Sequence, residues 1–156
     1  MSKFLRSNAL IILSAILLSI SRLPLYCGWI VFVAFVPLIY YFSKQEHSLK
    51  ELLLSALCFS FIQIGIVYYW IGSVTFTGLI GIWLLYSVQY SIVYYGIQRI
   101  GSSFPRLRFV AFISAFVSFE FIQNFGEMRF AWFNIGYSMA DELTLIPLVD
   151  IGGMSL

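Results

Sequence analysis

The stretch LLLSALCFSFIQIGIVYYWIG, Leu52–Gly72, decides the fold, because it contains no Asp, Glu, Lys or Arg over a length that can cross a membrane. About 20 helical residues span a hydrocarbon core roughly 30 Å thick. The strands of a membrane β-barrel would alternate apolar and polar residues, and this run does not. The stretch is typical of a transmembrane helix, which satisfies all of its backbone N–H and C=O groups internally.

The composition of the whole chain supports the same class. Of its 156 residues, 61% are hydrophobic and 10% are charged, and the mean hydropathy is +0.93. Soluble domains are about 45–50% apolar and about 25% charged, so a water-soluble fold of this length could not bury so much apolar surface. The net charge of +2 is too small to suggest a nucleic-acid partner.

Apolar runs between charged clusters predict an all-α, polytopic transmembrane helix bundle, with about five spans and the start of a sixth. Residues 1–156 would form one transmembrane domain that includes an outer aromatic loop at residues 127–142. The predicted spans are residues 7–21, 23–43, 52–72, 79–98 and 109–126, and the sixth apolar run begins near residue 143.

The distribution of basic residues predicts the orientation, because cytoplasmic loops carry an excess of Lys and Arg. Only Arg22 and Arg129 fall on the opposite side, so the N-terminus is expected to be cytoplasmic and the loop after Gly126 to face outward. The basic residues on the predicted cytoplasmic side are Lys3, Arg6, Lys44, Lys50, Arg99, Arg106 and Arg108.

Residue types that often carry chemistry are sparse. Cys27 and Cys58 are predicted to lie at different depths and to be packing residues. His47 lies beside Glu46 without a second ligand at metal spacing, and is expected to be a solvated loop residue. We therefore expect no metal site and no cofactor.

Glu120 is the sharpest anomaly, since an acidic residue at the centre of a membrane helix costs about 2.5–3.5 kcal/mol. Gln123 and Asn124 follow at i+3 and i+4, so one helix face carries a carboxylate and two amides that could hold it. Two interpretations stay open. Glu120 lines a polar or lipid-headgroup cavity near the outer surface, or it clamps two segments together, with Arg129 as a candidate partner.

Aromatic residues gather in two segments that are predicted to face the same compartment. One follows Glu120, and the other closes the span that ends at Gly72. An interfacial aromatic belt would explain both, and a cavity-lining loop that receives a lipid tail or headgroup is the alternative. The candidate residues of a lipid entrance are Trp70, Ser73, Phe76, Gly78, Glu120, Arg129, Phe130, Trp132, Asn134 and Tyr137.

Several segments, taken in order, carry a family resemblance. They are GWIVFVAFVPL (Gly28–Leu38), YWIGSVTFTG (Tyr69–Gly78), FAWFNIGYS (Phe130–Ser138) ten residues after Glu120, and DIGGMSL (Asp150–Leu156). Their order and spacing resemble the N-terminal membrane region of bacterial apolipoprotein N-acyltransferase.

The chain departs from the family's pattern at three positions. Gln123 stands where the family usually has Arg, Ala131 replaces the Pro of a Phe-Pro-Trp motif, and Thr77 replaces the first Gly of a Phe-Gly-Gly turn. An Arg at position 123 could form an ion pair with the glutamate or with a lipid phosphate, and the uncharged Gln123 cannot. Arg129, which lies close by, could substitute.

The resemblance implies a membrane-embedded part of an acyltransferase in the bacterial cytoplasmic (inner) membrane, with several passes. The family transfers an acyl chain from a phospholipid donor to the N-terminal diacylglyceryl-cysteine of a lipoprotein acceptor. Its cysteine nucleophile, glutamate base and assisting lysine belong to a nitrilase-like domain. No residue here matches those three, so neither Cys27, Cys58 nor Glu120 receives a catalytic role.

On this view the chain admits and positions lipid and is inactive alone, and a separate or downstream nitrilase-like domain would be its partner. Leu156 falls within an apolar run, which favours a part of a longer enzyme over a separate protein. The alternative is a small non-enzymatic membrane subunit of a transporter or scaffold. Glu120 would then be an intramembrane polar site on a proton or ion pathway.

Overall fold

The described part of the chain is helical throughout. The computed structural model describes residues 3–44, 46–125 and 134–140, and these contain no β-strand. The all-α prediction is confirmed. The α-helices are α1 Lys3–Ile20, α2 Ile30–Ala34, α3 Val36–Lys44, α4 Leu49–Val67, α5 Ile71–Val74, α6 Phe76–Ser103 and α7 Arg108–Ile122, and the 3₁₀ helices are η1 Pro105–Leu107 and η3 Ile135–Met139.

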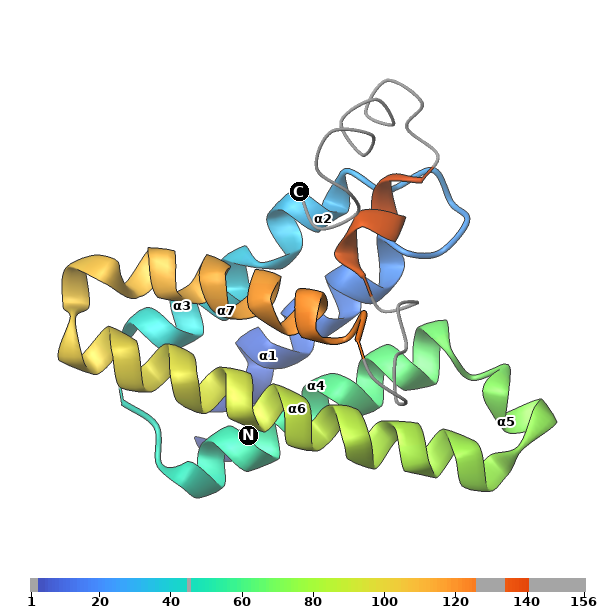
Figure 1. Cartoon of the computed structure of the whole chain (residues 1–156), viewed down its shortest axis with the longest axis horizontal. Coiled ribbons are helices and arrows are strands. Elements are labelled where there is room, and N and C mark those ends of the chain that lie inside the picture. Colours follow the sequence, from blue (N-terminus) through green and yellow to red (C-terminus); the bar gives the residue numbers. More distant parts are fainter. Residues whose placement is uncertain (1–2, 45, 126–133, 141–156) are drawn as a thin grey trace.

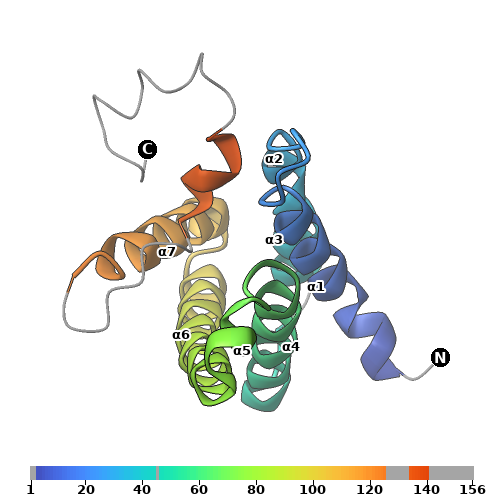
Figure 2. The same ribbon diagram turned by 90° about the vertical axis from the view of Figure 1, so that its right-hand side faces the viewer.

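Two helices, α4 and α6, form the centre of the bundle. They run antiparallel and are joined by the short α5 (Figure 1). In Figure 2, α1 and α3 lie on the α4 side of this pair and α7 lies beside α6. The bundle therefore has two ends, which we name the α5 end and the η1 end after the short helices found there.

Helix lengths support fewer membrane crossings than the predicted five. By length and composition, α4 and α6 are the described helices that could cross a bilayer, and Asn8–Ile20 and Ile30–Ser43 are shorter apolar helices. Pro37 is the second residue of α3. Because proline lacks an N–H and its ring clashes with the preceding turn, it accounts for the division of the second predicted span into α2 and α3. The boundaries of the individual spans stay predictions.

The connection before α4 contradicts one prediction. His47 is 5% exposed rather than solvated, and its ring stacks on Tyr41 with centroids 3.8 Å apart. Its backbone N–H donates to Gln98 Oε1 over 2.8 Å, while its carbonyl accepts from Gln98 Nε2 over 2.6 Å. His47 therefore fastens the α3–α4 connection to α6.

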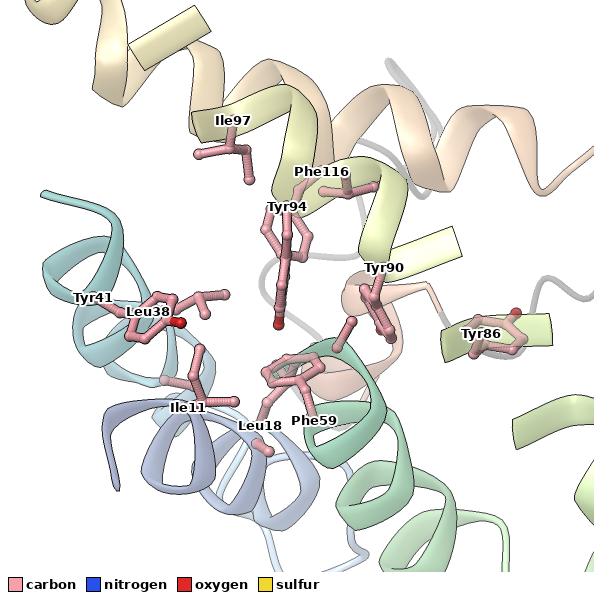
Figure 3. Close-up of a cluster of buried hydrophobic side chains, with 14 of the residues drawn as sticks. Ile11, Leu18, Leu38, Tyr41, Phe59, Tyr86, Tyr90, Tyr94, Ile97 and Phe116 are labelled. Carbon is pink, nitrogen blue, oxygen red and sulfur yellow. The ribbon is translucent and has the colours of Figure 1, made fainter. Parts of the chain in front are cut away.

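The core is aromatic and contains a few polar pairs. Tyr94 is fully buried and reaches toward Phe59, whose ring centroid lies 6.0 Å away (Figure 3). Tyr90 donates to Gln63 Oε1 over 2.8 Å and thereby joins α6 to α4. The edge-to-face ring contacts and the hydrogen bonds together fix how these two helices face each other.

A glycine sets the distance between the α1–α2 connection and η3. A Cβ at Gly28 would overlap the backbone carbonyl oxygen of Ser138. On the same connection, the Ser21 hydroxyl donates to Ser138 Oγ over 3.2 Å. Because the obstacle is backbone rather than a flexible side chain, a larger residue at position 28 would displace η3.

We predict that Gly28→Ala lowers the free energy of unfolding in detergent by about 1–3 kcal/mol, the usual cost of overpacking. Heat or denaturant unfolding of the purified chain measures it. Gly81→Ala is the matched control, because Gly81 lies in the interior of α6 and its added Cβ would meet nothing within 4 Å. It should leave stability unchanged or raise it by about 0.5–1 kcal/mol. Equal effects of the two changes would contradict the predicted overlap.

Candidate functional site

Glu120 lies near the end of α7 and holds η3 in place. Its side chain is 6% exposed, and Oε1 accepts a hydrogen bond from the backbone N–H of Ile135 over 2.6 Å. Ile135 is the first residue of η3, so the carboxylate satisfies one of the N–H groups that a helix start leaves free. This contact fits the clamp interpretation of Glu120, although with a backbone partner rather than with Arg129, which lies outside the described residues.

The two amides that follow Glu120 do not hold its carboxylate in the described contacts. Gln123 Nε2 donates across to Gln89 Oε1 of α6 over 3.1 Å. Asn124 Nδ2 donates to the backbone carbonyl of Glu120 over 3.2 Å. Gln123 therefore joins α7 to α6, and Asn124 caps the last turn of its own helix.

A layer of polar side chains continues from Glu120 through the bundle. Arg22 Nη1 donates to the Tyr68 hydroxyl over 3.0 Å and also interacts electrostatically with Glu120. Gln123 Oε1 and Asn134 Oδ1 are buried acceptors for which the described residues supply no hydrogen-bond donor. Buried acceptors of this kind can bind water or a donor group on a ligand.

The candidate entrance residues near α5 form an exposed turn. Trp70 and Phe76 are 40% and 69% exposed. The Ser73 hydroxyl donates to the Trp70 carbonyl over 2.6 Å, and the Gly78 N–H donates to Thr75 Oγ1 over 3.2 Å. A Cβ at position 78 would meet the Thr75 methyl group, so this cap favours glycine. The turn thus exposes Trp70 and Phe76 on a backbone that these two hydrogen bonds hold in place.

The other candidates lie at η3. Asn134 is buried before its first residue, and Tyr137 is exposed within it. Both views place η3 apart from α5 (Figures 1 and 2), so the structure does not gather the candidates into one compact site. Arg129, Phe130 and Trp132 lie outside the described residues.

A groove between α6 and α7 is the feature that sequence inspection missed. It encloses about 550 Å³, within the usual range for small-molecule sites. Small residues on α7 and Gly96 on α6 leave the space open, and the amides Gln89 and Gln123 line it as well. The other lining residues are Ile92, Val93, Ile100, Ala111, Ser114, Ala115, Ser118, Phe119, Ile122 and Phe125. The run of small residues on one face of α7 was the available signal.

The all-helical fold and the apolar groove are of the kind that helical membrane proteins have. The family model described as the apolipoprotein N-acyltransferase N-terminal domain matches residues 14–156. The match covers most of the chain, so the chain belongs to this family and is related to an acyltransferase. Neither the curated proteins nor the solved structures contain a significant match to it.

We predict that Glu120→Leu exposes the backbone of η3, because the Ile135 N–H would lose its charged acceptor, a bond worth about 1.5–3 kcal/mol. Hydrogen exchange at Ile135 should accelerate by at least tenfold. Glu120→Gln is the control, since its amide oxygen can still accept the bond, and its exchange should change much less. Equal protection in all three proteins would show that the carboxylate does not hold η3.

Proposed function

We propose that the chain is the membrane-embedded part of an apolipoprotein N-acyltransferase and that it admits and positions the acyl donor. The enzyme would move an acyl chain from a phospholipid to the N-terminal diacylglyceryl-cysteine of a lipoprotein. The chain would cross the bacterial inner membrane several times, with its N-terminus in the cytoplasm. The α6–α7 groove of a chain in this family is the observation that carries the proposal.

The groove suits a hydrocarbon chain with a polar end. Apolar and small side chains line most of it, so an acyl chain could lie along α6 and α7 without unpaired polar groups beside it. Gln89 and Gln123 would face the polar end of the lipid. Gln123 Oε1 is buried and has no donor among the described residues, so it could accept a hydrogen bond from an N–H or O–H group of the lipid. An ester group of the lipid has only acceptor atoms, so it would pair with an amide N–H group instead.

The mouth of this path is proposed at the outer side. Glu120 fixes η3 beside the end of α7, and η3 carries Asn134 and Tyr137. By the sequence alone, Arg129, Phe130 and Trp132 would join them. The separate turn with Trp70, Ser73, Phe76 and Gly78 would serve as an aromatic contact at the bilayer surface, where such rings are favoured.

In this proposal the covalent steps of acyl transfer take place in another domain, not in this chain. Acyl transfer through a thioester needs a cysteine thiolate, a base and a group that stabilises the oxyanion. The family places these in a nitrilase-like domain, and no position of this sequence matches them. A separate or downstream domain of that kind would receive the lipid from the groove.

A bulky residue in the groove tests the path for the acyl chain. Ala115→Trp should reduce photolabelling of the chain by a phospholipid with a diazirine in its acyl chain by at least threefold, because the indole would fill the space. Ile113→Trp is the control, since Ile113 is exposed on the same helix and does not line the groove. A result in which both variants are labelled like the original chain would rule out the groove as a lipid site.

The purified chain is expected to show no acyl transfer to a diacylated lipopeptide when it is the sole polypeptide present. Adding or fusing a nitrilase-like domain of the family should restore turnover. A mass-spectrometric assay of the triacylated product measures both. Turnover by the isolated chain would refute the assignment of the chemistry to another domain.

The rival function, a transporter or scaffold subunit, makes a different prediction about Glu120. A carboxylate on a proton path must exchange protons, so Glu120→Gln would abolish a proton-coupled activity. The bond from Glu120 to the Ile135 N–H favours a structural role instead. In the acyltransferase proposal, Glu120→Gln at most weakens stability or lipid binding.

A further inference from the structure

A second pocket lies at the η1 end, where α3, α6 and α7 meet. It encloses about 330 Å³ and is separate from the α6–α7 groove, with which it shares no lining residue. Its apolar walls include Ile39, Phe42 and Phe109, and its cationic side consists of Arg106 and Arg108. A ligand that fits this cavity has an apolar part for its walls and a negatively charged group for the two guanidinium groups.

The two arginines differ in how firmly they are held. Arg108 Nη1 donates to the Ser43 carbonyl over 2.9 Å, and Nη2 donates to the Gly101 carbonyl over 3.3 Å. Arg108 therefore ties the last turns of α3 and α6 together, a position that also suits the helix dipoles. Arg106 is exposed, and no hydrogen bond or ion pair to it occurs among the described residues. Its donors can turn toward a ligand.

The surroundings favour an anion. Helix α7 starts at Arg108 and has no acidic residue in its first turn, so the positive end of its dipole is not neutralised locally. Of the nearby acidic residues, Glu51 is engaged with Ser48 at the start of α4, and neither Glu46 nor Glu51 lines the pocket. Lys50 and Arg99 add positive charge at the same end.

We propose that this pocket binds an anionic phospholipid, with the phosphate on Arg106 and Arg108 and the start of an acyl chain against Phe109 and Ile39. Arginine suits this role because its planar group binds phosphate oxygens in pairs. Basic pockets between membrane helices on the cytoplasmic side bind headgroups of this kind. The inference rests on the proposed placement of the chain in a bilayer, but not on its role in acyl transfer.

The proposed lipid would differ from the acyl donor in place and purpose. The α6–α7 groove carries amides at its polar end, whereas this pocket carries arginines. By the predicted orientation the η1 end faces the cytoplasm, so the bound lipid would belong to the inner leaflet. It would stabilise the junction of three helices rather than react.

The test is to reconstitute the full chain in nanodiscs that contain phosphatidylcholine and a minor share of phosphatidylglycerol, and to measure the lipid retained by native mass spectrometry. We expect the chain to retain phosphatidylglycerol preferentially. Arg106→Ala should lower this preference by about fivefold, the effect of about 1 kcal/mol for one basic residue near the surface. Arg99→Ala is the matched control, because Arg99 is exposed at the same end but lies outside the pocket.

Three outcomes would overturn the inference: no preference for phosphatidylglycerol, no change in Arg106→Ala, or an equal loss in Arg99→Ala, which would indicate general surface charge. Failure of the chain to insert into nanodiscs at all would instead refute its proposed membrane placement. Normal insertion without lipid preference would refute this pocket alone. The two failures are therefore distinguishable.

Discussion

The need to pair polar groups across helices governs the arrangement of this bundle. An unpaired polar group in an apolar interior costs about 1–3 kcal/mol, and neither a hydrocarbon chain nor an aromatic ring can replace a hydrogen-bond partner. Ser60 and Ser87 pair over 2.7 Å between α4 and α6, with Gln63 and Tyr90 one turn further along. Sliding either helix by one residue would break both pairs. The polar residues therefore set the register of α4 against α6, which apolar packing alone does not specify.

Local sequence was sufficient for the fold class and insufficient for the environment of single residues. In an apolar medium the backbone can satisfy its hydrogen bonds only in helices or closed barrels, and runs that do not alternate apolar and polar residues exclude barrels, so the all-α prediction needed no tertiary information. His47 shows where such inference stops. Its burial depends on the ring of Tyr41 and on a hydrogen bond to Gln98, which is 51 residues away in the sequence. No local sequence pattern predicts the contact with Gln98. The break between α2 and α3 does have a local cause in Pro37, although residues 23–43 were predicted as one span.

The candidate site was also only partly predictable from the local sequence. The cost of burying a carboxylate predicted that Glu120 lines a polar cavity or clamps two segments, and the spacing suggested Gln123 and Asn124 as its partners, which they are not in the described contacts. The observed partner is a backbone N–H fifteen residues later, which becomes available only because the chain returns to α7 through η3. For the α6–α7 groove, the small residues on one face of α7 were a partial signal, but the groove itself depends on how that face lies against α6.

The unequal lengths of α6 and α7 have a consequence for any surrounding bilayer. Helix α6 has 28 residues and α7 has 15, which correspond to about 42 Å and about 22 Å. A hydrocarbon core of roughly 30 Å is shorter than the first and longer than the second, so α6 would tilt or protrude while lipid beside α7 would compress. The groove would then have one wall, α6, that is longer than the hydrocarbon core is thick and one wall, α7, that is shorter. A phospholipid bound in the groove would lie where the membrane is locally thinner. Its ester bonds would then lie closer to the bilayer midplane than those of the surrounding lipids.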